Sequence, residues 1–179
     1  MKYLVASDLH GRLNAALRFE NVIKEEAPDK ILFLGDFLYN GPRNGVPSDY
    51  DPLKVSEILK KYKDMTIAIR GNCDSRVDAM LLEMKFEDSV PLLINGIKAH
   101  LIHGDLIDDE LCKVYPGEML LFGHTHYYML EKKDGVIFLN PGSLGFPKGG
   151  NPASYAVMEN NYIEVRRFDN RSPILHFDL

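Results

Sequence analysis

Short apolar runs alternate with amphipathic segments through the first half of the chain. Each run has the length of a buried strand, and each amphipathic segment carries its apolar residues on one stripe at helical spacing. The pattern predicts strands at 3–6, 31–34 and 66–69 and helices at 13–26, at about 53–63 and around 76–82. Strands that alternate with helices favour a parallel sheet joined by right-handed crossovers.

The second half of the chain carries short strands with no helix between them. Apolar runs at 91–95 and 97–102 flank a tight Asn95-Gly96 turn, which is typical of a β-hairpin. Further strands are predicted at 119–122, 127–132, 136–139, 154–159 and 162–168. Two stacked sheets flanked by helices would bury both halves. With no internal repeat or linker, we expect a single domain over residues 1–179.

Five polar clusters directly follow apolar runs. They are Asp8-Leu9-His10, Gly35-Asp36, Gly71-Asn72, His103-Gly104 and Gly123-His124-Thr125-His126. Together they supply two aspartates, four histidines and one side-chain amide. Active sites of open α/β sheets form at strand ends, and this donor set suits a pair of metal ions. The sequence therefore indicates an enzyme.

Spacing within the clusters supports this interpretation. Asp8 and His10 are two residues apart, so on a continuing strand both would point to one face. His124 and His126 have the same spacing, which is a common metal signal. Each residue alone also reads as an ordinary turn, cap or strand-end residue. Such an ordered series at strand ends, with glycine beside five of the seven residues, is improbable as a set of unrelated turns.

Composition narrows the class of protein. The 179 residues are 45% hydrophobic and 26% charged, as in a globular domain. No apolar stretch approaches the roughly 20 residues that cross a bilayer, and the N-terminus shows no signal-peptide pattern, so we expect no membrane partner and a cytoplasmic location. Only two cysteines, Cys73 and Cys112, fit a reducing compartment. The net charge of −5 disfavours nucleic acid as the main partner.

The ordered motifs identify a family. Asp-x-His, Gly-Asp, Gly-Asn-x-Asp, His-Gly and Gly-His-x-His, over residues 8–126, resemble the calcineurin-like metallophosphoesterases. The chain is more similar still to the small bacterial and archaeal phosphodiesterases of the YfcE type. That closer likeness is carried by Asn40-Gly41-Pro42-Arg43-Asn44, by residues 70–75, by Asn140-Pro141-Gly142-Ser143 and by residues 147–155.

This resemblance implies an α/β fold in the form of a four-layer α/β/β/α sandwich. It also implies a metal-dependent phosphodiesterase, in which a hydroxide bridging two metal ions attacks a small phosphodiester substrate. One ion would be held by Asp8, His10, Asp36 and His126. The other would be held by Asp36, Asn72, His103 and His124, so that Asp36 bridges. Imidazole and carboxylate ligands suit Mn, Fe, Zn or Ni, and the family leans towards manganese.

The residues expected to act on the substrate are Asn72, Asp36, His124, Cys73 and Arg43. The Asn72 amide would donate to a phosphoryl oxygen, and Arg43 is either a phosphate fork or a loop anchor. Cys73 stands where many members of the superfamily have a histidine that protonates the leaving group. A thiol is a poor proton donor to an alkoxide, so we expect diesters with good leaving groups to react best.

Several other polar residues have two interpretations. Asp74 either orients His10 or another ligand, or caps a helix that starts near Arg76. Lys148 is a second basic residue near the site or a solvated side chain, and loop 37–51, with Tyr39 and Asn40, would shape the pocket. We expect His100, on the opposite strand face from His103, to lie outside the site, and His176 to be structural.

Other functions remain open at this stage. The same fold serves as a nearly inactive scaffold in retromer-type trafficking complexes, although such relatives tend to have lost metal ligands that are all present here. A phosphomonoesterase would need more cationic groups than Arg43 and Lys148, and a nuclease would need a basic groove. Exposed edges of the second sheet would allow a homo-oligomer.

Overall fold

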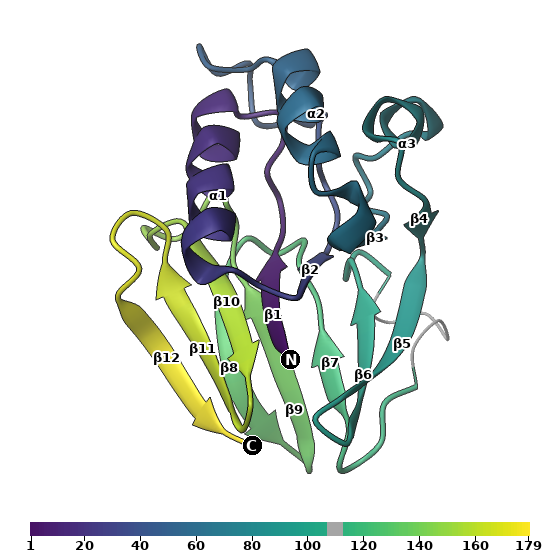
Figure 1. Ribbon diagram of the computed structural model, residues 1–179, viewed down its shortest axis with the longest axis vertical. Helices are drawn as coiled ribbons and strands as arrows, with labels where there is room; N and C mark the ends of the chain where they lie inside the picture. Colours follow the sequence, from purple (N-terminus) through teal and green to yellow (C-terminus); the bar gives the residue numbers. More distant parts are fainter. Residues whose placement is uncertain (107–112) are drawn as a thin grey trace.

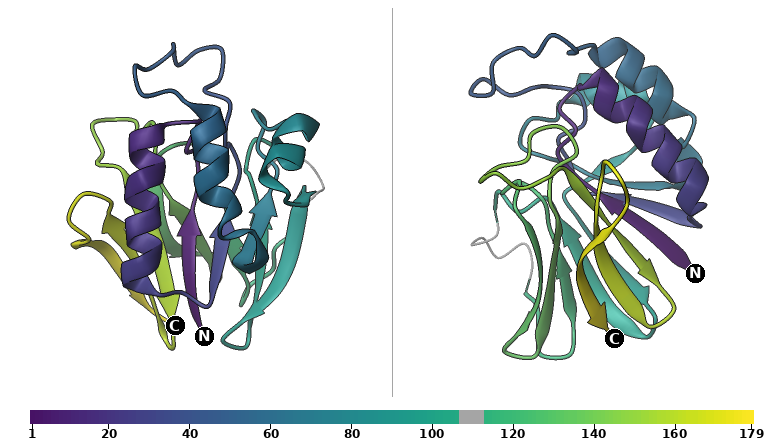
Figure 2. Two further views of the ribbon diagram at one scale, coloured as in Figure 1. Left: turned by 45° about the horizontal axis from the view of Figure 1, so that its top comes forward. Right: turned by 90° about the vertical axis from the view of Figure 1, so that its left-hand side faces the viewer.

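The computed structural model describes residues 1–106 and 113–179. Two β-sheets stack face to face, and helices cover the outer face of one of them (Figures 1 and 2). The helices are α1 (Leu13–Glu26), α2 (Pro52–Lys60) and α3 (Arg76–Leu82), with a 3-10 turn at Lys63–Met65. Cys112 lies outside the described residues.

The larger sheet has seven strands in the order β12-β11-β10-β1-β2-β3-β4. Their bounds are β1 (Lys2–Ala6), β2 (Lys30–Phe33), β3 (Thr66–Ile69), β4 (Phe86–Glu87), β10 (Ser154–Glu159), β11 (Tyr162–Arg167) and β12 (Pro173–Asp178). Strands β1 to β4 are parallel, whereas β10, β11 and β12 join them in antiparallel pairs. The predicted alternation of strands and helices in the first half is therefore a parallel sheet with crossovers.

The smaller sheet has five strands in the order β5-β6-β7-β9-β8. Their bounds are β5 (Ser89–Ile94), β6 (Ile97–Ile102), β7 (Met119–Leu121), β8 (Tyr128–Lys133) and β9 (Val136–Pro141). Strands β5 and β6 form the predicted hairpin, and Asn95 and Gly96 at its turn both have positive φ, 51° and 81°. Both sheets are mixed.

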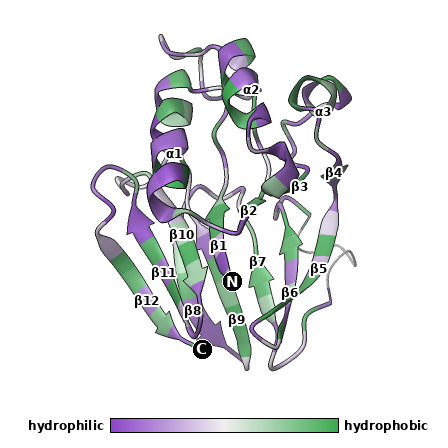
Figure 3. Ribbon diagram, in the orientation of Figure 1, coloured by the Kyte–Doolittle hydropathy of each residue, from purple (hydrophilic) through white to green (hydrophobic). Residues whose placement is uncertain are grey.

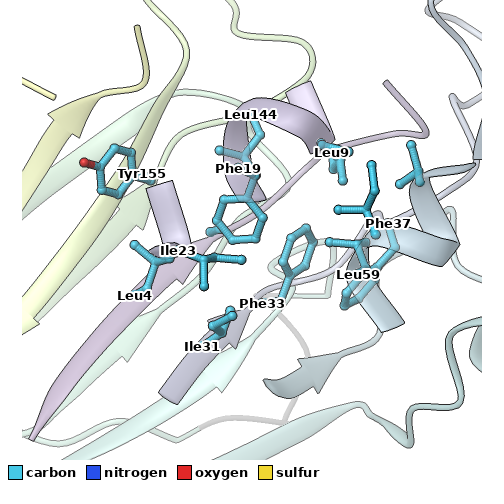
Figure 4. Close-up of a cluster of buried hydrophobic side chains, with 14 of the residues drawn as sticks. Leu4, Leu9, Phe19, Ile23, Ile31, Phe33, Phe37, Leu59, Leu144 and Tyr155 are labelled. Carbon is cyan, nitrogen blue, oxygen red and sulfur yellow. The ribbon is translucent and has the colours of Figure 1, made fainter. Parts of the chain in front are cut away.

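Two apolar clusters hold these layers together. One lies between the helices and the larger sheet, where Phe33 lies 4.1 Å from Phe37 between ring centroids (Figure 4). The other lies between the two sheets. In β1, Leu4 and Ala6 belong to the first cluster and Val5 to the second, so the strand is apolar on both faces. Figure 3 shows the resulting hydrophobic strands at the centre of the molecule.

The predicted α/β architecture of two stacked mixed sheets with outer helices is confirmed. Among the described residues, the helices pack against the larger sheet, and the outer face of the smaller sheet carries a cluster of Ile102, Leu120 and Phe122. The prediction omitted β4 and β12 and extended α2 past Lys60. No helix in the described part of the chain is long and apolar enough to span a membrane. Pairing of copies along the edges of the smaller sheet stays a prediction.

Glu26 ties the end of α1 to the larger sheet. Its carboxylate lies 2.8 Å from Lys2 Nζ, and it accepts hydrogen bonds of 2.8 Å from Tyr155 Oη and Arg166 Nη1. Burial opposes its charged form, but these three donors outweigh burial and hold the pKa of Glu26 below its ordinary value of 4.5.

We predict that Glu26→Gln lowers the free energy of unfolding at pH 7 by about 1–3 kcal/mol, because Lys2 and Arg166 lose the negative charge with which they pair. The folded pKa of Glu26 lies below the unfolded value, so its contribution is present above that value and is lost as pH falls through the folded pKa. Urea denaturation at neutral and acidic pH should therefore show a difference from wild type that shrinks on acidification.

The matched control is Glu25→Gln. Glu25 is an exposed neighbour that pairs with Arg171 at the surface. It should change the free energy of unfolding by less than about 1 kcal/mol at either pH. A Glu26→Gln difference that persists unchanged in acid would contradict the proposed role of the carboxylate.

Candidate metal centre

The seven predicted ligands lie together, at the C-terminal ends of five strands. Asp8 and His10 follow β1, Asp36 follows β2, Asn72 follows β3, His103 follows β6, and His124 and His126 follow β7. Strands β1, β2 and β3 belong to the larger sheet, and β6 and β7 to the smaller one. The centre therefore sits where the two sheets come together at one end of the sandwich.

Three of these residues form a first donor group, Asp8, His10 and His126. His126 Nε2 lies 3.3 Å and His10 Nε2 3.8 Å from Asp8 Oδ1. The two Nε2 atoms are 3.4 Å apart. All three side chains are buried.

A second donor group consists of Asn72, His103 and His124. Asn72 Oδ1 lies 3.0 Å from His103 Nε2 and 2.8 Å from His124 Nδ1, and these two nitrogens are 3.3 Å apart. Asp36 lies between the groups: its Oδ2 is 3.5 Å from Nε2 of His10 in the first group and 3.5 Å from Nε2 of His103 in the second.

The backbone at these residues differs from the expectation. Strand β1 ends at Ala6 and β7 at Leu121, so the idea that each pair points to one face of a continuing strand is wrong. Five of the seven candidate ligands adopt left-handed backbone instead, with φ between 54° and 63° at Asp8, His10, Asp36, His124 and His126. Non-glycine residues occupy this region at a cost, so the surrounding structure must impose it.

Backbone hydrogen bonds between neighbouring strand ends impose this left-handed conformation. The amide nitrogen of Asp8 donates to the Gly35 carbonyl over 3.0 Å, and those of Leu9 and His10 donate to the Asp36 carbonyl over 2.9 and 3.0 Å. Leu9 itself is buried in the cluster beneath the helices. The turn after β1 therefore anchors one side chain in the core while its two neighbours reach the centre.

Backbone carbonyls also set the tautomer of three histidines. The Nδ1 atoms of His10, His103 and His126 lie 2.8, 2.6 and 2.6 Å from the carbonyl oxygens of Tyr39, Leu34 and Phe146. A carbonyl can only accept, so each Nδ1 carries the hydrogen and donates it. Nε2 is then the nitrogen that each imidazole, when neutral, offers to a cation at the centre, which is how metal-binding histidines are oriented.

The pKa values of the two carboxylates, Asp8 and Asp36, are shifted in opposite directions. Burial raises the pKa of Asp8 to about 7. Burial opposes the charged form of Asp36 too, but the hydrogen bond and charge of His103 outweigh it and lower the pKa of Asp36 to about 2. For the same pair, Asp36 overcomes burial and raises the pKa of His103 to about 9.

The donor set fits metal ions. Ligands that each lie about 2.0–2.2 Å from one cation are roughly 3–3.5 Å from each other, and the separations here run from 2.8 to 3.8 Å. Asp8 Oδ1 is buried with no hydrogen-bond partner among the described residues. Paired lone-pair nitrogens at 3.4 Å in the first group repel each other unless a cation lies between them.

Asp74 does not cap α3 or contact His10, but it holds in place another candidate ligand, Asp36. Its carboxylate accepts hydrogen bonds of 2.8 Å from the backbone nitrogens of Asp36, Phe37 and Gly71, so it fixes the loops that carry Asp36 and Asn72. No histidine in the described part of the chain is its partner, and Ser75, with Asp78, caps α3. The motif marked Asp74 as important, but its partners are backbone atoms that no sequence pattern shows.

Ser143 and Phe146 support the centre and were missed by the sequence reasoning. The buried Ser143 hydroxyl donates to the Asp8 carbonyl and accepts from the Phe146 nitrogen, each over 2.8 Å. Phe146 in turn orients His126 through its carbonyl. Ser143 belongs to the Asn140-Pro141-Gly142-Ser143 motif, whose sequence indicated a family resemblance but no contact with Asp8.

A cavity of about 830 Å³ opens onto the centre. Its lining includes Tyr39, Arg43, Cys73 and Lys148 besides several ligands. Cys73 is half-buried, and its backbone nitrogen donates a hydrogen bond to Asp36 Oδ1 over 2.9 Å. Burial, together with the Asp36 charge, raises the pKa of the Cys73 thiol to about 12.

Residues expected outside the centre do lie outside it. His100 Nε2 is 3.0 Å from Glu118 Oε2, and His176 lies between Glu164 and Asp178 at the surface. Asn40, in contrast, was expected to shape the pocket, and this expectation is wrong: its side chain is buried and is not part of the cavity lining. Its backbone carbonyl accepts from Asn44 Nδ2 over 2.7 Å and so stabilises the loop.

Comparisons with known proteins match most of the chain. The model of the calcineurin-like phosphoesterase superfamily domain matches residues 1–161. Phosphodiesterase YfcE of Escherichia coli K12 is 39% identical over 178 residues, which cover 97% of this chain and 96% of that protein. A solved structure of YfcE, described as a phosphoesterase from E. coli, superposes with a TM-score of 0.94 and 37% identity over 99% of each chain.

A more distant likeness concerns the fold alone. Vps29 from Entamoeba histolytica, in the crystal structure of a single mutant, superposes with a TM-score of 0.67 and 19% identity, over 100% of this chain and 99% of that one.

We predict that Gly71→Ala weakens Mn²⁺ binding roughly 10- to 100-fold, the size of effect that misplaced supporting groups have on metal sites. A Cβ at Gly71 would overlap the Asp36 carboxylate, which would have to move. Isothermal titration calorimetry measures the change. Gly96→Ala is the control, because its hairpin site is open and the substitution strains only the backbone. Equal Mn²⁺ affinity in both variants would contradict the prediction.

Proposed function

The chain belongs to the calcineurin-like phosphoesterase superfamily, and we propose that it is a phosphodiesterase whose seven ligands hold two divalent metal ions. The observation that carries the proposal is the place of Asp36. One oxygen of its carboxylate is equidistant, at 3.5 Å, from a histidine of each donor group, as a ligand shared by two ions would be.

The proposed ligand sets follow the two donor groups. Asp8, His10 and His126 with Asp36 hold one ion, and Asn72, His103 and His124 with Asp36 hold the other. Mixed imidazole and carboxylate donors support Mn, Fe, Zn or Ni over Ca or Mg, and we propose Mn. Such a pair of ions supplies an activated water as nucleophile and offsets the charge on the phosphoryl oxygens.

The chain's own residues orient the substrate. Asn72 directs its carbonyl oxygen to His103 and His124, which leaves its amide group on the other side, 3.4 Å from Cys73 Sγ. The amide nitrogen is therefore the donor proposed for a phosphoryl oxygen. His124, half-exposed in the cavity, and Arg43 are proposed to contact the same group. We propose a small phosphodiester as substrate and the cytoplasm as location.

The alternative of an interaction scaffold rests on the likeness to Vps29, which concerns the fold alone. The complete donor set supports hydrolysis instead. A scaffold would bind metal without turning over any diester, so activity separates the two.

We predict Mn²⁺-dependent hydrolysis of bis(p-nitrophenyl) phosphate, followed by release of p-nitrophenolate. A chelator should abolish it, and Asp36→Asn should reduce kcat/KM roughly 100-fold or more, because the shared ligand loses its charge. Asp64→Asn, an exposed carboxylate remote from the cavity, is the matched control and should retain activity. Tight Mn²⁺ binding with no turnover would favour the scaffold, and faster hydrolysis of p-nitrophenyl phosphate would favour a phosphomonoesterase.

A second prediction concerns Cys73. Cys73→His should raise kcat/KM more for diesters with poor leaving groups than for activated ones, because an imidazolium can protonate a departing alkoxide and a thiol cannot do so well. The measurement compares methyl p-nitrophenyl phosphate with a dialkyl diester in both enzymes. Cys73→Gln serves as the control for the size of the new side chain, and an equal gain on both substrates would refute the leaving-group assignment.

A further inference from the structure

Two cations line the cavity without protein partners. The side chains of Arg43 and Lys148 are exposed, and among the described residues neither donates a hydrogen bond or forms an ion pair. Most basic side chains elsewhere in the larger sheet and its helices are paired, as Lys2 and Arg166 are with Glu26. The cavity thus holds two positive charges that form no ion pair with an acidic side chain of the described residues.

Lys148 is held beside the centre by a built turn. Its backbone nitrogen donates to the His126 carbonyl over 3.4 Å, and its carbonyl accepts from the Asn151 nitrogen over 3.1 Å. The turn needs glycine: Gly149 has φ +65°, and a Cβ there would lie 2.5 Å from the Tyr127 ring. A lysine whose only role was to make the loop hydrophilic would not need a turn that fixes its backbone beside the centre.

Lys148 shares the cavity lining with three of the candidate ligands, His10, His124 and His126. The ammonium group is therefore placed to act on a substrate bound at the centre.

A simple diester leaves these charges unbalanced. The charge of two divalent ions would be offset by the Asp8 and Asp36 carboxylates, a hydroxide nucleophile and the single negative charge of the scissile diester. Arg43 and Lys148 then remain as positive charge on the wall of the cavity. Asp74 also lines the cavity, but its carboxylate accepts from three backbone nitrogens and pairs with neither cation, so a matching ligand carries negative charge beside Arg43 and Lys148.

We propose that Lys148 and Arg43 bind a second anionic group, a phosphate or carboxylate, on the ester arm that occupies this cavity. The preferred substrates are then phosphodiesters with a further negative charge on the arm that the enzyme retains while the other leaves. This inference rests on the proposed function and defines its substrate class.

The test compares two diesters with the same leaving group. Thymidine 5′-(p-nitrophenyl phosphate) and its 3′-phosphorylated form both release p-nitrophenolate and differ only in one added phosphate. With Mn²⁺, wild type should favour the phosphorylated form in kcat/KM by about tenfold, the effect of one hydrogen-bonded charge pair. The preference should fall at high salt, because exposed charges are screened.

Variants assign the effect to the two residues. Lys148→Met should remove most of the preference while leaving kcat/KM for the unphosphorylated diester within about twofold, and Lys148→Arg should keep the preference. Arg43→Gln should also reduce the preference, but it should lower kcat/KM for both diesters, because Arg43 is proposed to contact the scissile phosphoryl group as well. Lys132→Met, on exposed β8 away from the cavity, is the matched control and should change neither substrate. Calorimetric Mn²⁺ affinity should not weaken in Lys148→Met, which separates substrate binding from support of His126.

Each other outcome counts against the proposal. A wild-type preference of one or less overturns it, as does a Lys148→Met variant that loses activity equally on both diesters, since Lys148 would then serve the scissile phosphate. If Lys148→Met and Arg43→Gln lost more kcat/KM on p-nitrophenyl phosphate than on the phosphorylated diester, both cations would be assigned to binding a phosphomonoester substrate instead. Absence of turnover on every substrate would remove the proposed function itself, whereas turnover without preference removes only this inference.

Discussion

The position of the Asp36 carboxylate is the constraint on which the centre depends. The backbone nitrogen of Asp36 donates to the Asp74 carboxylate, and the backbone carbonyl of Asp36 accepts from the nitrogens of Leu9 and His10. Asp36 Oδ1 accepts from the Cys73 backbone nitrogen. These bonds join the loops after β1, β2 and β3, so the three strand ends of the larger sheet are fixed relative to one another. Oδ2 is left to face the two donor groups.

Holding these groups opposes folding. Five ligands in the left-handed region cost about 1 kcal/mol or more each, and together this approaches the net stability of about 5–15 kcal/mol of a small domain. Facing lone pairs and the unpaired Asp8 oxygen add to that cost. The apolar central strands, buried on both faces, supply the stability that offsets it, and bound cations would add more by mass action.

The sequence predicted the elements with strong periodicity and the convergence of the seven candidate ligands, because both depend on local patterns. Helix α1 and strand β10 have the predicted bounds, and Asp8 to His126 converge as expected. The rest depends on contacts that no local pattern encodes. Strand β12 was missed because Pro173 opens it and its exposed residues mask the alternation. The turns at Asp8 and His124, and the backbone partners of Asp74 and Ser143, are set by neighbouring loops distant in sequence.

Those loops couple recognition to metal geometry. Loop 37–51 orients His10 through the Tyr39 carbonyl and carries Arg43, while the loop after β9 orients His126 through Phe146 and carries Lys148. Arg12 joins the two loops, with Nε 2.6 Å from Asp49 Oδ1 and Nη1 donating to the Gly145 carbonyl over 3.0 Å. Because the same backbone segments aim the imidazoles and carry the cations, a change in loop conformation that moved Arg43 or Lys148 would also move a ligand. Substrate charge and metal affinity are therefore expected to be linked in this enzyme, and side-chain substitutions that leave the loop backbone in place are the way to separate them.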